Sequence, residues 1–130
     1  MSTDSTKRNV YPDKELTEKI IGCSFKVFNN LGYGLAERIY QTAMAVELSK
    51  NKIQYKKELF GKVIFKEVVV GRYFLDFLVE KKIAVELKVR NEIYDKDVSQ
   101  LLNYLKSKKL KIGLLLAITK NGIKIKRLIN

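Results

Sequence analysis

The spacing of apolar residues changes along the chain from a helical to an alternating pattern, which limits the folds open to its 130 residues. From Leu16 onwards, apolar residues recur at steps of three and four, which predicts a helix over residues 13–31 that ends at Gly32. A second helix is expected over residues 35–51, which contain no glycine or proline. Beyond residue 58, apolar and polar residues alternate as they do in strands. The chain is therefore expected to combine helices with a sheet.

The remaining elements are expected in the order strand, strand, strand, helix, strand, strand, over residues 59–65, 68–79, 83–89, 95–109, 112–118 and 123–129. The apolar run before Thr119 is typical of a strand covered on both faces, and Asn121-Gly122 predicts a hairpin turn. The fold class is thus α/β in the sense of α+β, a mixed sheet with helices packed on it. We expect one domain over residues 13–130 and a flexible arm over residues 1–12.

Composition excludes several classes of chemistry. The chain has no histidine and a single cysteine, so it cannot carry a Ser-His-Asp or Cys-His system, a conventional zinc site or a disulfide framework. A lone thiol suits a reducing cytoplasm, and no apolar run is long enough for a membrane span or a signal segment. The net charge is +12, and residues 81–130 hold 13 basic but only 4 acidic side chains. This distribution indicates a nucleic-acid partner, although solubility alone would explain it equally well.

Two carboxylates are predicted to meet on neighbouring strands. If residues 80–82 form the loop, Val79 pairs with Ile83, and the ladder then places Asp76 opposite Glu86. Opposed side chains have Cβ atoms about 4.5–5.5 Å apart, so these like charges repel each other by about 3 kcal/mol. Lys88 on the same face offsets part of that repulsion, and a bound cation would reverse it. Without histidine or paired thiolates, two carboxylates favour Mg²⁺ or Mn²⁺.

A mixed charged face on a solvated hairpin is the alternative explanation for these carboxylates. It fits poorly because apolar residues flank the charges on both strands. The same alternation predicts that one face of the second strand carries a run of apolar side chains, namely Tyr73, Leu75, Phe77 and Val79. Neither strand therefore resembles a solvated edge.

Glu37 is a further carboxylate candidate, on the second predicted helix. At 100° per residue it lies in line with Met44 and Leu48, at the head of an otherwise apolar stripe, so it would need a partner if buried. Equally, a carboxylate in the first turn could simply favour the helix dipole. A second apolar stripe on this helix is expected to pack on the first helix, and it consists of Leu35, Ile39, Ala43 and Val46.

Gln100 and Tyr104 lie four residues apart and are therefore expected to share one face of the third major helix. That face could contact a phosphate backbone or a metal-bound water, or it could be an ordinary solvated face. The opposite side is expected to enter the core through Val98, Leu101, Leu102 and Leu105.

Four lysines are candidates for binding nucleic acid. Lys96 and Lys108 lie on the third major helix, on the side of Gln100. Lys124 and Lys126 project from one side of the last strand. These two could extend a basic track, but we favour the alternative that they protect an edge strand from mispairing.

Residues 34–40, Gly-Leu-Ala-Glu-Arg-Ile-Tyr, match the signature G-x-x-E-x-x-Y. With this match the chain resembles the GxxExxY proteins of the PD-(D/E)XK nuclease superfamily from about Leu16 to its C-terminus. The further landmarks, in chain order, are Asp76, Glu86-Leu87-Lys88 and Gln100-x-x-x-Tyr104. The last of these is similar to the Q-x-x-x-Y element of the RecB-like exonuclease branch. A lone E-x-K pattern is weak, whereas this ordered set is specific.

The resemblance implies a restriction-endonuclease-like αβββαβ core with an added N-terminal helix and a C-terminal hairpin strand. It implies that Asp76 and Glu86 bind Mg²⁺ or Mn²⁺ and that Glu37 completes the metal shell. Lys88 would position or deprotonate the attacking water and stabilise charge. The Q-x-x-x-Y pair would help hold the active site and the strand being cut.

The leading hypothesis is a cytoplasmic, metal-dependent nuclease acting on nucleic acid, with DNA favoured and no membrane partner. The alternative is a non-catalytic module that binds nucleic acid or regulates a partner while retaining the nuclease fold. The intact acidic set argues against this alternative, because drift would be expected to remove an unfavourable carboxylate. A homodimer or a partner protein could supply the specificity that a chain of 130 residues has little room to encode.

Overall fold

The structure is a computed structural model that describes residues 13–130, so the arm predicted over residues 1–12 lies outside the described residues. The elements follow the predicted order and are α2 (Lys14–Leu31), α3 (Glu37–Lys50), β1 (Tyr55–Phe65), β2 (Val68–Val79), β3 (Ile83–Val89), α4 (Asp95–Lys108), β4 (Ile112–Thr119) and β5 (Gly122–Ile129). The largest difference from the predicted bounds is in β1, which begins at Tyr55 rather than at Leu59. Within residues 13–130, no helix is both long enough and apolar enough to span a membrane.

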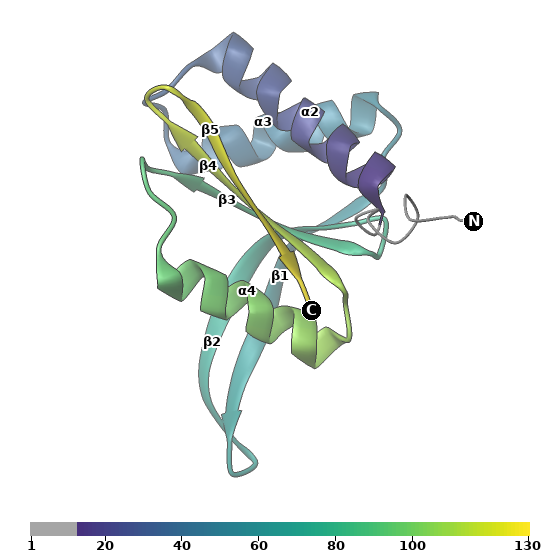
Figure 1. The fold of residues 1–130 in the computed structure, drawn as a ribbon, viewed down its shortest axis with the longest axis vertical. Helices are drawn as coiled ribbons and strands as arrows, with labels where there is room; N and C mark the ends of the chain where they lie inside the picture. The colour runs from purple at the N-terminus through teal and green to yellow at the C-terminus, as the bar shows by residue number, and fades with distance from the viewer. Residues whose placement is uncertain (1–12) are drawn as a thin grey trace, which may run out of the picture.

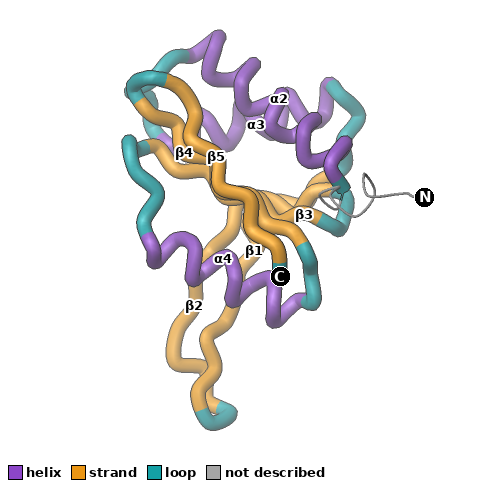
Figure 2. Tube along the Cα trace, in the orientation of Figure 1, coloured by secondary structure: helices purple, strands orange, loops and turns teal. Residues whose placement is uncertain are grey.

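The five strands form one mixed sheet in the order β1-β2-β3-β4-β5. Strands β3 and β4 are parallel and are joined through α4, whereas the other neighbours are antiparallel. Figures 1 and 2 show α2 and α3 lying side by side, with α4 separate from them. The prediction of a mixed sheet with helices packed on it is confirmed.

Two apolar clusters lie on opposite faces of the central strands. Alternate residues of β3 and β4, such as Val85 and Leu114, pack with α2 and α3. The intervening residues, such as Leu115, pack with Leu101 and Leu105 of α4. Every residue of β4 is buried, which confirms the prediction of a strand covered on both faces.

The predicted single apolar face of β2 is wrong. Phe77 and Val79 pack in the cluster under α2 and α3, whereas Tyr73 and Leu75 pack in the cluster of α4. The β2–β3 ladder ends at Phe77, and beyond it β2 continues only with β1. A two-stranded ribbon twists more strongly than a wide sheet, so the same side of β2 turns from one helical layer to the other.

The predicted second apolar stripe of α3 is also wrong. Leu35, Ile39 and Val46 are 38%, 41% and 52% exposed. Helix α2 meets a different side of α3, where Lys26 Nζ lies 3.9 Å from Glu47 Oε2. Because one neighbouring helix covers one side only, Leu35, Ile39 and Val46 remain at the surface, whereas Ala43 packs against the core.

The β1–β2 hairpin projects beyond the rest of the molecule (Figure 1). Its turn residues Lys66 and Glu67 have φ of 48° and 67°, and the register shifts between Val63 and Ile64. Near its base, Tyr73 crosses β1 at Gly61, where an added Cβ would lie 2.3 Å from the tyrosine ring. Only glycine leaves room for this crossing.

Candidate metal and catalytic site

The pairing of β2 with β3 brings Asp76 and Glu86 together. The ladder runs from Val79 opposite Ile83 to Phe77 opposite Val85, which confirms the predicted register. One position beyond the Phe77–Val85 pair, the carboxylate side chains of Asp76 and Glu86 accept hydrogen bonds from the backbone of the opposite strand. The Leu87 N–H donates to Asp76 Oδ2 at 2.6 Å, and the Asp76 N–H donates to Glu86 Oε1 at 3.2 Å. Each carboxylate therefore bonds the backbone of the opposite strand.

Lys88 contributes the positive charge of the site. It lies two positions beyond Glu86, so alternation puts both side chains on the same face of β3. Its Nζ lies 3.2 Å from Glu86 Oε2, and the Glu86 residue is only 8% exposed. The structure thus places the Lys88 ammonium directly beside the buried Glu86, which is paired with the half-buried Asp76.

Gln41 of α3 is a site residue that sequence reasoning missed. Its Nε2 donates to Asp76 Oδ1 at 2.6 Å and lies 3.4 Å from Glu37 Oε2. Its spacing of four residues from Glu37 could have indicated it, because residues four apart share a helix face. Gln41 thus links Glu37 to Asp76. Among the side chains that the structure describes, no group of three or more Asp, Glu, Cys or His residues is close enough to hold a metal ion.

Burial makes both carboxyl groups difficult to ionise. It raises the pKa of Asp76 from 3.8 to about 6, opposed by the Leu87 N–H bond and assisted by the negative charge of Glu37. It raises the pKa of Glu86 from 4.5 to about 8, assisted by the charge of Asp76 and opposed by Lys88. A divalent cation between these groups would favour the ionised form of both.

The Gly34-to-Tyr40 segment fixes the start of α3. Gly34 has φ of 110°, which residues with a side chain rarely adopt. The buried Tyr40 hydroxyl donates to the Gly32 carbonyl oxygen and accepts a bond from the Leu35 N–H. This bonded turn sets where α3 begins, at Glu37. Gly34 and Tyr40 thereby position the first turns of the helix, which carry Glu37 and Gln41.

Gln100 and Tyr104 do not share an exposed face of α4. Gln100 is exposed, whereas Tyr104 is 2% exposed and packs in the cluster of α4. The expectation that Tyr104 points away from the core is therefore wrong. The reason is that the strongly twisted β1–β2 ribbon brings Tyr73 against this side of α4. The buried side of the helix therefore includes Tyr104 as well as its leucines.

The four candidate lysines, Lys96, Lys108, Lys124 and Lys126, are all exposed. Strand β5 is an edge of the sheet, as edge protection by its lysines requires. The register also aligns Lys88, Ala117 and Lys124 in one row across β3, β4 and β5. Neighbouring strands lie about 4.8 Å apart, so the backbone of Lys124 lies about 10 Å from that of Lys88, and both side chains are on the same face of the sheet.

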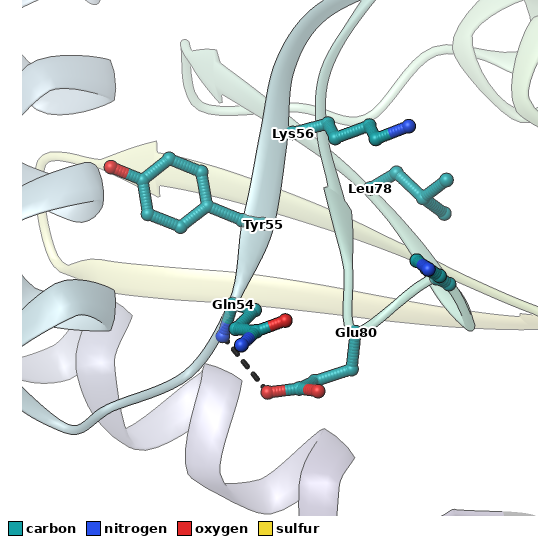
Figure 3. A pocket seen from close by; sticks show the side chains of 6 residues that line it. Gln54, Tyr55, Lys56, Leu78 and Glu80 are labelled. Atoms are coloured by element: carbon teal, nitrogen blue, oxygen red, sulfur yellow. Dashed lines mark hydrogen bonds between the residues drawn. The ribbon is translucent and has the colours of Figure 1, made fainter.

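Two pockets lie along β1, away from the carboxylate pair. The first, of about 380 Å³, is lined by Gln54, Tyr55, Lys56, Leu78, Glu80 and Lys81, and the Gln54 N–H donates to Glu80 there (Figure 3). None of the predicted site residues lines it. The second, of about 440 Å³, lies between β1 and the end of α4, and Lys108 is among its lining residues.

Comparison with known proteins places the chain in a family. Among curated proteins, none matches the chain by sequence. The crystal structure of SSO0001 is similar to the fold, with a TM-score of 0.55 and 14% identity over 92% of this chain and 80% of that chain. The family model described as PD-(D/E)XK nuclease superfamily matches residues 14–128, which include the carboxylate pair and Lys88. The mixed α+β fold is the one expected of that family, and the chain belongs to the PD-(D/E)XK nuclease superfamily.

Proposed function

We propose that this protein is a metal-dependent nuclease that hydrolyses phosphodiester bonds of nucleic acid, with DNA as the favoured substrate. The observation that carries the proposal is the pairing of the half-buried Asp76 with the buried Glu86, with Lys88 at 3.2 Å from Glu86. Burial raises the pKa of both carboxyl groups, and adjacent carboxyl groups with raised pKa values are typical of functional sites. The Gly34-to-Tyr40 signature supports placing the chain among the GxxExxY proteins of its superfamily.

The donor set fits Mg²⁺ or Mn²⁺. Both side chains offer hard oxygen ligands, which these ions prefer. Among the groups that the structure describes, each of the four carboxylate oxygens has one hydrogen-bond or ion-pair partner, which is the Gln41 amide, the Leu87 N–H, the Asp76 N–H or the Lys88 ammonium. Because an ionised oxygen has two lone pairs, each oxygen retains one for a cation. When bound, such an ion lowers the pKa of a coordinated water and stabilises negative charge on a phosphate oxygen.

The protein side chains divide the remaining work. Asp76 and Glu86 hold the cation, and Gln41 fixes the orientation of Asp76 through its 2.6 Å bond. The Lys88 ammonium stands beside Glu86, where it can orient the attacking water and stabilise charge that develops on the phosphate. We propose that Glu37 does not bind the cation directly. It accepts a hydrogen bond from Gln41 at 3.4 Å and so orients the side chain that bonds Asp76. This assignment differs from the direct ligand role that the sequence predicted.

The basic side chains would hold the nucleic acid. Lys124 and Lys126 lie on the face of the sheet that carries Glu86 and Lys88, and Lys96 and Lys108 lie on α4. Contacts of this kind bind phosphates without reading sequence and weaken steeply with salt. The alternative, a module that binds nucleic acid without cutting it, does not account for two adjacent carboxyl groups that burial makes difficult to ionise.

The test is cleavage of end-labelled and internally labelled DNA in Mg²⁺ or Mn²⁺. We expect cleavage by the wild type that stops in EDTA and is lost in Asp76→Asn, Glu86→Gln and Lys88→Ala. Glu15→Gln/Glu18→Gln is the matched control, because it removes two exposed carboxylates of α2. Equal activity of wild type and Asp76→Asn would refute the proposal, since a contaminating nuclease would then explain the cleavage.

A further inference from the structure

One face of the β1–β2 hairpin carries aromatic and basic side chains in successive pairs. The register is continuous from Tyr55 opposite Val79 to Val63 opposite Gly71. Alternation along this ribbon therefore puts the pair Phe60 and Phe74 on one face, followed on the same face by the pair Lys62 and Arg72.

The two phenylalanines are exposed side by side. Phe60 is 47% exposed and Phe74 is 71% exposed, and their ring centroids lie 6.5 Å apart at an interplanar angle of 57°. Isolated exposed apolar residues are ordinary, but a contiguous exposed patch indicates an interaction site. Aromatic rings presented in this way suit the stacking of unpaired bases.

The basic pair next to them favours an anionic partner. Lys62 and Arg72 are directly opposed on the ladder and both are exposed. Like charges in opposed positions destabilise a strand pair, and no salt bridge to either residue occurs among the described side chains. A phosphate backbone would relieve this repulsion, as a cation would relieve that of Asp76 and Glu86.

The aromatic and basic pairs lead away from the carboxylate site. Asp76 lies two residues from Phe74 and four from Arg72 on the same side of β2. At 3.3 Å per residue these positions lie about 7 Å and about 13 Å along the strand from Asp76. The spacing suits one nucleotide next to the site and the phosphates of the nucleotides beyond it.

The hairpin base is anchored, so this face has a fixed direction. The Tyr73 side chain lies across Gly61, and Asn103 of α4 donates to the Tyr73 hydroxyl at 2.9 Å. The hairpin is thereby tied to the same helix that packs on the sheet. The hairpin base is therefore held in place, and Phe74 and Arg72 follow Asp76 along the same side of a ribbon that twists between them and the site.

We propose that Phe60, Phe74, Lys62 and Arg72 bind an unpaired strand of nucleic acid, by base stacking and phosphate contacts, and guide it to the carboxylate pair. The guiding role rests on the proposed nuclease function, whereas binding itself does not. An unpaired strand is the occupant that fits, because bases within a duplex are already stacked and leave no face for the two rings.

The first test uses the absence of tryptophan from the chain, which makes a single introduced tryptophan a unique fluorophore. In EDTA, where no cleavage occurs, we expect an oligothymidylate to quench the fluorescence of Phe74→Trp. The matched control is Phe25→Trp, at a position 40% exposed on α2, which should not respond. An unchanged Phe74→Trp signal at oligonucleotide concentrations that saturate binding would overturn the proposal.

The second test measures binding of a labelled oligothymidylate by fluorescence anisotropy in EDTA. Phe60→Ala/Phe74→Ala should weaken binding about 5- to 150-fold, the range for loss of one stacked base. Lys62→Ala/Arg72→Ala should reduce the salt slope of log K by about 1.4, at 0.7 per lost contact to a single strand. The control Lys19→Ala/Lys50→Ala removes the same charge from exposed positions on α2 and α3 and should leave the slope unchanged.

The outcomes separate this inference from the proposed function. A wild type that binds through this face but never cuts would contradict the nuclease proposal alone. A wild type that cuts, with hairpin variants that bind and cut equally well, would overturn this inference alone. Tighter binding of duplex than of single strands would also overturn it. So would a wild-type dimer that Phe60→Ala/Phe74→Ala dissociates without a change in oligonucleotide binding, because the face would then pair two copies of the chain.

Discussion

Replacement of Glu86 by glutamine should stabilise the metal-free protein, but only at high pH. Burial raises the pKa of Glu86 from 4.5 to about 8. The folded state therefore keeps a proton that the unfolded state releases, and stability declines as the pH rises from 4.5 through 8. At about 1.4 kcal/mol per pH unit, this decline is at most about 5 kcal/mol. Glutamine avoids it, keeps an acceptor for the Asp76 N–H and gives up the contact with Lys88, so we expect a net gain of about 2–5 kcal/mol at pH 9.

The assay is urea unfolding followed by circular dichroism in EDTA at pH 5 and pH 9. At pH 5 residue 86 is neutral in the folded state of both proteins, and ionisation of the unfolded wild type costs it less than about 1 kcal/mol, so the free energies of unfolding should agree within about 1 kcal/mol. Glu18→Gln, at an exposed position of α2, is the control and should change neither value. A Glu86→Gln variant that is equally stable as the wild type, or less stable, at pH 9 would refute the reasoning about the buried pair.

Three further outcomes are expected. Lys88→Ala should reduce cleavage at least about 100-fold while retaining Mn²⁺ binding, as measured by turnover and calorimetry on the same preparation; loss of both would make it a structural residue. Glu37→Gln should weaken Mn²⁺ binding about 10-fold, as removal of an outer partner does, and complete loss of binding would make Glu37 a direct ligand. Gly61→Ala should destabilise the fold by about 1–3 kcal/mol through its clash with Tyr73. Its control is Gly71→Ala, where the nearest side-chain atom is 3.9 Å away, and equal unfolding midpoints would contradict the crossing.

Much of the architecture could be predicted from the sequence because the patterns are local. The change from helical spacing to alternation identified all eight elements in the right order. The three-residue loop between β2 and β3 fixed the register, since Val79 must then face Ile83. That register alone brought Asp76 beside Glu86, and the site therefore followed from counting along two strands.

What the sequence could not predict depends on twist and on neighbours. Alternation does not reveal that the β1–β2 ribbon rotates Leu75 and Phe77 toward different helices. For the same reason, helical spacing predicts Tyr104 at the surface, although it packs in one cluster with Tyr73. Gln41 carries no charge and no motif, and only the approach of α3 to β2 shows that it bonds Asp76.

The most direct test of the central claim is isothermal titration of Mn²⁺ into the wild type and into Asp76→Ala/Glu86→Ala. We expect saturable binding to the wild type and no binding to the folded double variant. Glu15→Gln/Glu18→Gln, which loses the same charge from exposed positions of α2, should bind as the wild type does. Equal Mn²⁺ binding by the wild type and the Asp76→Ala/Glu86→Ala variant would contradict the claim that these two carboxylates form the metal site.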